Sequence, residues 1–239
     1  MDEDTRLRLS KSKVAAFEHC PKRLWLQVHR REVGSVDQRT QALFAAGHGV
    51  GALAREQLPN GHLVHEDHRN VEGAIAHTKA LLSGPCDRPI FEAAFQREDV
   101  VIRADILEPD GRGGWSFIEV KNSTSVRQYI LNDVTTQGWT ALGDGLRIST
   151  FAVRHVRHKV RTESDLSRCI FIDTDITWLV LGLIPRRLAV IEAARACVRG
   201  PEPMRKVGPH CTRPFACEFR DYCQALAVSC ANRRDTWLL

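Results

Sequence analysis

Apolar residues recur at helical spacing along the first third of the chain. The segment LSKSKVAAFEHCPKRLWLQVHR predicts a helix that is capped at Ser10 or Ser12, is interrupted at Cys20–Pro21, and resumes with an apolar stripe. A second long helix is expected between residues 36 and 58, and a third over residues 71–82. The amino-terminal third is therefore expected to be helical.

The middle of the chain changes to the alternation that is typical of β-strands. Three runs, PIFEAAFQ, VVIRADILE and WSFIEVKN, are separated by polar stretches such as EPDGRGG, which predicts a meander of antiparallel strands. Beyond it we expect a helix over residues 125–142, strands at ISTFAVRHV and RCIFID, and a helical stretch over residues 177–198 that is bent or split at Pro185. This order predicts a single domain over residues 1–239, with an α/β fold and a central mixed sheet flanked by helices.

Composition limits the class of protein more than its function. The 239 residues are 43% hydrophobic and 26% charged, which is ordinary for a globular domain, and the formal net charge of +5 suits a polyanionic partner. The amino-terminal residues carry no secretory signal, and the longest apolar run, 176–184, is far shorter than the roughly 20 residues that span a bilayer. We expect a cytoplasmic protein without a membrane partner.

Two acidic residues on neighbouring strands of the meander are candidate metal ligands. If the turn between those strands is centred on Arg112, Asp105 lies opposite Glu119, and Lys121 points to the same side. Adjacent carboxylates repel unless a cation lies between them, and two carboxylates with a backbone carbonyl suit Mg²⁺ or Mn²⁺. Lys121 would then orient an attacking water or stabilise charge on a phosphate. An exposed ladder of ion pairs is the alternative.

Three of the eight cysteines, Cys211, Cys217 and Cys223, are separated from one another by five residues each. In a reducing compartment, metal ligation explains such a group better than disulfides do. A fourth thiolate must then come from elsewhere in the chain. Four further cysteines are interpreted as packing residues: Cys86, Cys169, Cys197 and Cys230.

Asp105, followed after a hairpin by Glu119-Val120-Lys121, resembles the signature of PD-(D/E)XK nucleases. The chain is similar to the RecB-like branch of that family, which includes CRISPR-associated exonucleases and the nuclease domains of recombination helicases. In that branch a helical His precedes the sheet, matched here by His48, and a Gln follows on the next helix, matched by Gln137.

This resemblance implies a restriction-endonuclease-like core. Ala141 departs from the pattern, because related sequences carry Tyr at that position. His48 taken alone has a structural histidine as its alternative. The implied metal ligands are His48, Asp105, Glu119 and the carbonyl of Val120, and the implied catalytic residues are Asp105, Glu119, Lys121, Gln137 and, on the preceding strand, Glu92.

RecB-like iron-sulfur nucleases are also similar to this chain in their cysteines, with one near the amino end and three near the carboxyl end around a four-iron four-sulfur cluster. Cys20 in EHCPKRLW matches the first. The resemblance implies an iron-sulfur subregion formed by residues 10–35 and 205–230, a clasp that joins the two terminal segments. Zinc on the same four ligands, or unrelated buried cysteines, are the alternatives. The implied cluster ligands are Cys20, Cys211, Cys217 and Cys223.

The densest basic run, which comprises Arg154, Arg157, Lys159 and Arg161, predicts contacts to a phosphate backbone, with a solvated edge strand as the alternative. The resulting hypothesis is a Mg²⁺- or Mn²⁺-dependent deoxyribonuclease, an exonuclease on single-stranded DNA ends. The sequence leaves open whether the chain also has a protein partner in a DNA repair or defence complex. The rival hypotheses are a non-catalytic iron-sulfur module that binds DNA or serves as a scaffold, and a cluster-based redox sensor.

Overall fold

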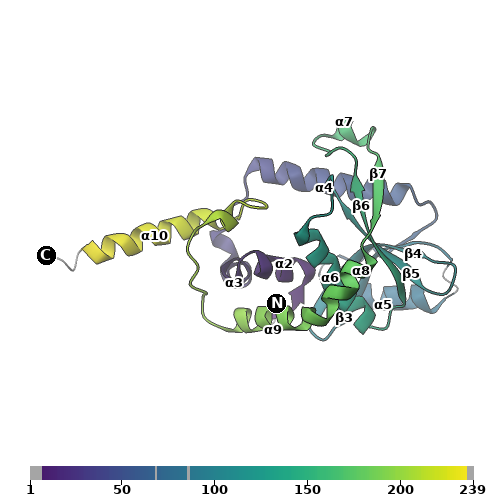
Figure 1. The fold of residues 1–239 in the computed structure, drawn as a ribbon, viewed down its shortest axis with the longest axis horizontal. Helices are drawn as coiled ribbons and strands as arrows, with labels where there is room; N and C mark the ends of the chain where they lie inside the picture. Colours follow the sequence, from purple (N-terminus) through teal and green to yellow (C-terminus); the bar gives the residue numbers. More distant parts are fainter. Residues whose placement is uncertain (1–6, 68, 85–86, 236–239) are drawn as a thin grey trace. The chain divides into compact units, whose positions relative to one another are not determined.

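The computed structural model describes residues 7–67, 69–84 and 87–235, and Figure 1 labels their helices and strands. These residues form two compact units. The first, called here the sheet unit, comprises Leu9–Lys11 and Arg39–Leu188. The second, called here the cysteine unit, comprises Ser12–Gln38 together with the described residues before Leu9 and from Ala189 onward. The segments expected to form the iron-sulfur subregion therefore lie in the cysteine unit, apart from Ser10 and Lys11.

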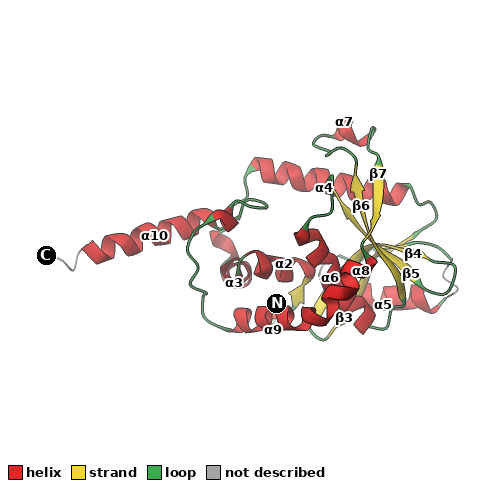
Figure 2. Cartoon of the chain, viewed as in Figure 1, coloured by secondary structure: helices red, strands yellow, loops and turns green. Residues whose placement is uncertain are grey.

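A seven-stranded mixed sheet is the centre of the sheet unit (Figure 2). Its order is β2-β3-β4-β5-β6-β7, and β1 pairs with β4 outside this path. The pairs β3–β4, β4–β5 and β6–β7 are antiparallel, whereas β1–β4, β2–β3 and β5–β6 are parallel. The strands are β1 (Leu9–Ser10), β2 (His62–Leu63), β3 (Ile90–Arg97), β4 (Val100–Pro109), β5 (Trp115–Lys121), β6 (Ile148–Val156) and β7 (Phe171–Asp175).

Helices cover both faces of this sheet. Ala54 of α4 packs on Ile106 and Ile118, whereas α6 lies against the alternate face, which presents Phe117 and Phe151. No helix in the described ranges is both long enough and apolar enough to cross a membrane. The helices, 3₁₀ turns included, are α2 (Lys11–His19), α3 (Pro21–His29), η1 (Arg31–Val33), α4 (Gln38–Glu56), α5 (Val71–Ser83), α6 (Gln128–Gly143), α7 (Glu163–Leu166), α8 (Thr177–Leu183), η2 (Ile184–Arg186), α9 (Arg187–Arg199), η3 (Pro209–Cys211) and α10 (Arg220–Asp235).

Both breaks predicted at proline are confirmed. Helix α2 ends at His19 and α3 begins at Pro21, a position where the missing amide costs no helical hydrogen bond. The stretch expected over 177–198 is split into α8 and α9 by η2, which contains Pro185. The α/β class, the central mixed sheet and the antiparallel meander are likewise as predicted.

The last strand starts later than RCIFID predicts. The amide of Arg168 donates to the carbonyl of Asp165 and that of Cys169 to the carbonyl of Leu166, which closes the turn after α7. These residues are therefore unable to join the ladder, and β7 begins only at Phe171. The two-residue strands β1 and β2 were not predicted, because two residues carry no alternation.

One edge of β4 is shared by two strands, an arrangement called here the fork. Strand β3 occupies one side of β4 along Val100–Leu107. On the other side, β1 pairs with β4 at Val100 and Val101, while β5 pairs with it from Ile106 onward. On this side of β4 the ladder is interrupted between the pairs with β1 and the pairs with β5, and Asp105 lies in the interruption.

Candidate functional site

Asp105 and Glu119 are neighbours across the fork. The pairs Ile106↔Ile118 and Leu107↔Phe117 give the register that the sequence predicted, and one step further the same register brings Asp105 opposite Glu119. At that step the backbone-to-backbone hydrogen bond between the strands is replaced by a bond to a side chain: the amide of Val120 donates to Oδ2 of Asp105 over 2.8 Å. The two predicted acids therefore converge.

Glu119 is the buried centre of the site, with 1% of its side chain exposed. The Nζ of Lys11 donates to Oε1 over 2.9 Å and to Oε2 over 3.1 Å. The Nζ of Lys121 lies 2.9 Å from Oε1, and Nε2 of Gln137 donates to Oε2 over 2.7 Å. A carboxylate with so many charge-assisted donors is stabilised in its ionised form even without access to water.

Lys11 is the residue of this site that the sequence prediction missed. Besides Glu119, its ammonium lies 3.4 Å from Oε1 of Gln137 and 3.9 Å from Oδ1 of Asp105. It reaches this position because β1 pairs in parallel with β4 and ends directly before Lys11. A single lysine 108 positions before Glu119 carries no signal of this contact in the sequence.

Lys121 is held from two sides. Its Nζ lies 2.9 Å from Glu119 and donates to Oδ2 of Asp133 over 3.0 Å. Asp133 and Gln137 are one turn apart on α6, so both face the end of β5, as their spacing indicates. Helix α6 thus fixes the lysine with one residue and the buried glutamate with the other.

Gly138 allows α6 to lie close enough to the sheet for these contacts. A Cβ on Gly138 would meet ring atoms of Phe151 at 2.9 Å and Cγ1 of Val180 at 3.3 Å. The absence of a side chain therefore brings the neighbouring Gln137 within reach of Glu119.

The two acids have pKa values that are shifted in opposite directions. Burial and the negative charge of Glu119 raise the pKa of Asp105 to about 7. Burial alone would also raise the pKa of Glu119, but the ammonium groups of Lys11 and Lys121 outweigh it and lower that pKa to about 2. Burial disfavours both ammonium groups, yet Glu119 above all keeps the pKa of Lys11 and of Lys121 above the ordinary value.

The donor atoms at the fork match those that a hard divalent cation prefers. Asp105 and Glu119 supply carboxylate oxygens, and Val120, which lies between Glu119 and Lys121, adds a backbone carbonyl. Both carboxylates are ionised at slightly alkaline pH, given their pKa values of about 7 and about 2. The residue types thus fit Mg²⁺ or Mn²⁺.

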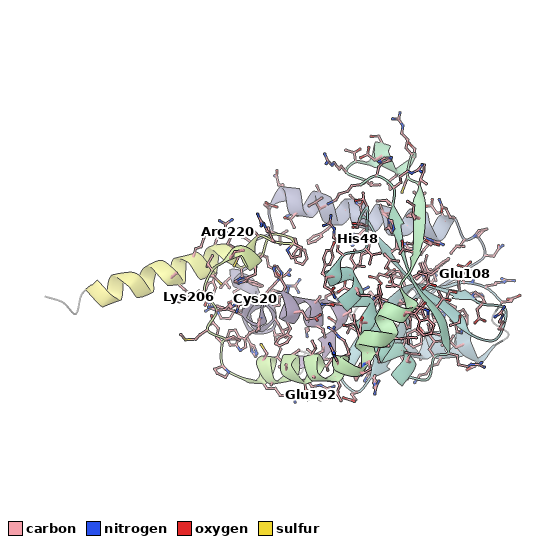
Figure 3. The ribbon with its side chains drawn as sticks, in the orientation of Figure 1. Cys20, His48, Glu108, Glu192, Lys206 and Arg220 are labelled. Carbon is pink, nitrogen blue, oxygen red and sulfur yellow. The ribbon has the colours of Figure 1, made fainter. Side chains whose placement is uncertain are left out.

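The structure does not bring His48 or Glu92 into the cluster of lysines and acids around Glu119. His48 is exposed on α4 (Figure 3). Glu92 on β3 has a φ of 58° and forms ion pairs with Arg55 at 3.4 Å and with Arg103 at 3.5 Å. Within the described ranges, no group of three or more His, Cys, Asp or Glu residues is placed so that it could hold a metal ion.

The basic run divides into one paired and three exposed residues. Arg154 on β6 forms a bidentate pair with Asp173 on β7, with distances of 2.8 Å and 2.7 Å. Arg157, Lys159 and Arg161 follow the end of β6 and are exposed. Arg154 therefore joins two strands, and the three residues after it are the ones presented to solvent.

The four cysteines expected to bind a cluster line a single cavity of the cysteine unit. Figure 3 shows Cys20 with Lys206 and Arg220, which line the same cavity. None of the four forms a disulfide. Burial raises the pKa of Cys217 to about 11 and also raises that of Cys223. The residues around the four thiols are Lys22, Arg23, Leu26, Arg205, Lys206, Val207, His210, Phe219 and Arg220.

This lining fits a cluster with thiolate ligands. Four thiols are the usual ligand set of an iron-sulfur cluster or a structural zinc ion, and the surrounding lysines and arginines offset the negative charge of either centre. Hydrogen bonds tie the segments together, since Arg23 pairs with Glu218 at 2.9 Å and the indole of Trp25 donates to Gly200 over 2.9 Å.

The other cysteines have separate surroundings. Cys169 packs against the buried cluster of Val50, Val156 and Val160 in the sheet unit. The thiol of Cys197 donates to the carbonyl of Pro21 over 3.2 Å. Cys86 and the side chain of Cys230 lie outside the described residues.

Comparison of the chain with models of protein families gives no match, and comparison with curated proteins gives none either.

Proposed function

We propose that this chain is a Mg²⁺- or Mn²⁺-dependent deoxyribonuclease with a restriction-endonuclease-like core, and that it acts on single-stranded DNA ends. The observation that carries the proposal is the convergence of Asp105, Glu119 and Lys121 at the fork, with Gln137 bonded to the same glutamate. Two carboxylates beside an oriented lysine form a constellation that can support metal-assisted phosphodiester hydrolysis.

Each residue of the fork has a role in this proposal. Asp105, Glu119 and the carbonyl of Val120 would hold the divalent cation. The cation would polarise a phosphate and make water a nucleophile near neutral pH. Lys121, oriented by Glu119 and Asp133, would stabilise the negative charge that develops on the phosphate oxygens.

The cysteine cavity would hold a four-iron four-sulfur cluster on Cys20, Cys211, Cys217 and Cys223. Its role in the proposal is structural, because its ligands come from both ends of the chain and closing so long a loop restricts the unfolded state. The exposed residues Arg157, Lys159 and Arg161 would contact the DNA backbone.

Cleavage assays with the anaerobically purified chain test the proposal. End-labelled single-stranded, duplex and circular DNA would be incubated with Mg²⁺, Mn²⁺ or a chelator, and progressive shortening of linear strands with intact circles would identify an exonuclease. Asp105→Asn, which keeps an oxygen for the Val120 amide, and Lys121→Met are expected to lower the rate about 10²-fold or more. Glu108→Gln, on the same hairpin, is the matched control. Equal cleavage by wild type and both site variants would remove the proposal.

A non-catalytic DNA-binding or scaffold module is the second candidate. Two observations favour it: Lys11 already compensates the charge of Glu119, and a buried Ala141 stands where the resembling family has Tyr. This candidate predicts tight DNA binding that needs the cysteine unit but shows no metal-dependent turnover. Binding and cleavage measured on the same preparation separate the two.

A further inference from the structure

The ammonium of Lys11 lies where the proposed function needs a divalent cation. It donates to both oxygens of Glu119, at 2.9 Å and 3.1 Å, and lies 3.9 Å from Asp105. The cation that relieves the repulsion between the two acids in this structure is thus supplied by the chain itself.

The acceptor capacity of Glu119 is fully used. A carboxylate offers about four lone-pair positions. Lys11 uses one lone-pair position on Oε1 and one on Oε2. Lys121 uses a second position on Oε1, and Gln137 uses a second position on Oε2. Because Mg²⁺ binds oxygens at about 2.0–2.1 Å, a metal ion and all of these donors are unable to use the same oxygens at once. One donor has to leave.

The charges indicate that the donor that leaves is one of the two ammonium groups. With all groups ionised, Asp105, Glu119 and Asp133 carry three negative charges, against two positive charges on Lys11 and Lys121. Adding a divalent cation leaves one excess positive charge in a largely buried site. Moving one ammonium out restores neutrality, which the low dielectric of the interior strongly favours.

Lys11 is held less firmly than Lys121. Lys121 ends the long parallel ladder between β5 and β6 and is also paired with Asp133 at 3.0 Å. Lys11 follows a strand of two residues that pairs with β4 at two positions. The two side chains are similarly exposed, at 22% for Lys11 and 25% for Lys121, so the difference lies in the length of the ladder before each lysine. Glu119 and Gln137, in contrast, are fixed by the sheet and by α6.

We propose that Lys11 is a resident counter-ion that a divalent metal ion displaces on binding, so that Lys11 sets the metal affinity of the site. This inference rests on the proposed function only in that it takes the fork to be the metal site. It assigns Lys11 a positioning role toward Glu119 and not a contact with the DNA.

Mn²⁺ binding to the metal-free fork tests the proposal without DNA. The electron paramagnetic resonance signal of free Mn²⁺ would be titrated against wild-type protein, Lys11→Gln and Lys11→Met, with Asp105→Asn giving the background from other sites. Both Lys11 variants are expected to bind Mn²⁺ about tenfold more tightly, a change of about 1.4 kcal/mol. Lys13→Gln removes the same charge on the same helix, where Nζ donates to the carbonyl of Arg8, and is expected to leave the affinity unchanged.

A second measurement uses the wild-type chain, in case the variants do not fold. Acetylation of lysines would be followed by mass spectrometry with and without Mn²⁺, with Lys13 as the internal reference. Displacement predicts faster acetylation of Lys11 when Mn²⁺ is present, because its ammonium then faces solvent. Unchanged or slower acetylation overturns the proposal.

The outcomes separate this proposal from the nuclease function. Unchanged or weaker Mn²⁺ binding by the Lys11 variants, or an equal gain in Lys13→Gln, overturns the displacement model even if the protein cuts DNA. Tighter Mn²⁺ binding by the Lys11 variants supports the displacement model, even if no DNA is cut, provided that this binding is lost when Asp105→Asn is added to the same variants. Absence of Asp105-dependent binding in wild type and variants alike overturns it too.

Discussion

The ammonium of Lys11 lies 2.9 Å from a carboxylate oxygen of Glu119, although 108 positions separate the two residues. Glu119 is 1% exposed, so Lys11 and Lys121 provide the charge that lets its carboxylate stay ionised inside the protein. The chemistry of the fork and the stability of the sheet unit are therefore linked through one buried side chain.

Glu119→Gln is expected to destabilise the protein by about 3 kcal/mol, because it leaves the ammonium groups of Lys11 and Lys121 without their main counter-ion. Denaturant unfolding in the presence of a chelator measures this. Glu108→Gln, on the same hairpin but outside these ion pairs, is expected to change stability by less than about 0.5 kcal/mol. Equal effects of the two substitutions would show that the buried ion pairs do not stabilise the fold.

The pKa of Asp105, raised to about 7 by burial and by Glu119, predicts a pH dependence of stability. A carboxyl whose pKa is higher in the folded than in the unfolded state contributes stability that is lost as the pH rises through the folded value. The metal-free protein should therefore lose stability between pH 5 and about pH 8. Glu119 does not contribute in this window, because its lowered pKa of about 2 affects only strongly acidic solutions.

Asp105→Asn is the variant that checks this pH dependence, because it cannot ionise. Its free energy of unfolding in chelator should vary less with pH than that of the wild type, and the two curves should diverge toward alkaline pH. Parallel curves would mean that Asp105 does not titrate in this range.

Gly138→Ala is expected to destabilise the protein by about 1–3 kcal/mol, because the new Cβ would meet the ring of Phe151 at 2.9 Å and push α6 away from the sheet. Gly182→Ala on α8 is the control, since a Cβ there has nothing within 4 Å and the higher helix propensity of Ala should stabilise by up to about 1 kcal/mol. Thermal unfolding of both variants gives the comparison. The same sign for both would contradict the close packing at Gly138.

Simultaneous replacement of Arg157, Lys159 and Arg161 by Gln should weaken single-stranded DNA binding and flatten its salt dependence. Each lost phosphate contact lowers the slope of log K against log salt by about 0.7, so a decrease of about 2 is expected. Fluorescence anisotropy at several salt concentrations measures it. Arg154→Gln should leave the slope nearly unchanged, because Arg154 is paired with Asp173. A flatter slope in Arg154→Gln alone would reverse this assignment.

Cys217→Ser is expected to abolish the visible absorption and the iron content of anaerobically purified protein and to lower its thermal stability, because Cys217 lines the four-thiol cavity. Cys169→Ser, in the sheet unit, should keep the metal. Metal analysis that finds zinc in place of iron would retain the site but change its occupant. Metal content unaffected by Cys217→Ser would remove Cys217 from the ligands.

Periodicity predicted most of the elements, because long amphipathic helices and alternating strands leave a local pattern. The meander with its turn centred on Arg112 is the clearest example, and that register alone brings Asp105 opposite Glu119. Prolines marked the ends of α2 and α8 for an equally local reason, the missing amide.

The position of Lys11 could not be predicted in this way. Its contact with Glu119 depends on the parallel pairing of β1 with β4, and a two-residue strand has neither alternation nor turn residues to announce it. The repulsion between the two carboxylates predicts a cation beside them. A metal ion and a lysine both satisfy that prediction, so the charges alone do not distinguish between them. Helix α10 was likewise not predicted, because the segment was interpreted only through its cysteine spacing.

At the fork, the two-residue strand β1 determines the position of Lys11 beside the two acids. The amide of Leu9 donates to Asp99, and β1 meets β4 at Val100 and Val101 alone, so this is the shortest ladder beside the acids. Short ladders open first in native-state hydrogen exchange. Exchange rates of the Leu9 and Ser10 amides would thus report how often β1 separates from β4 in a given sample.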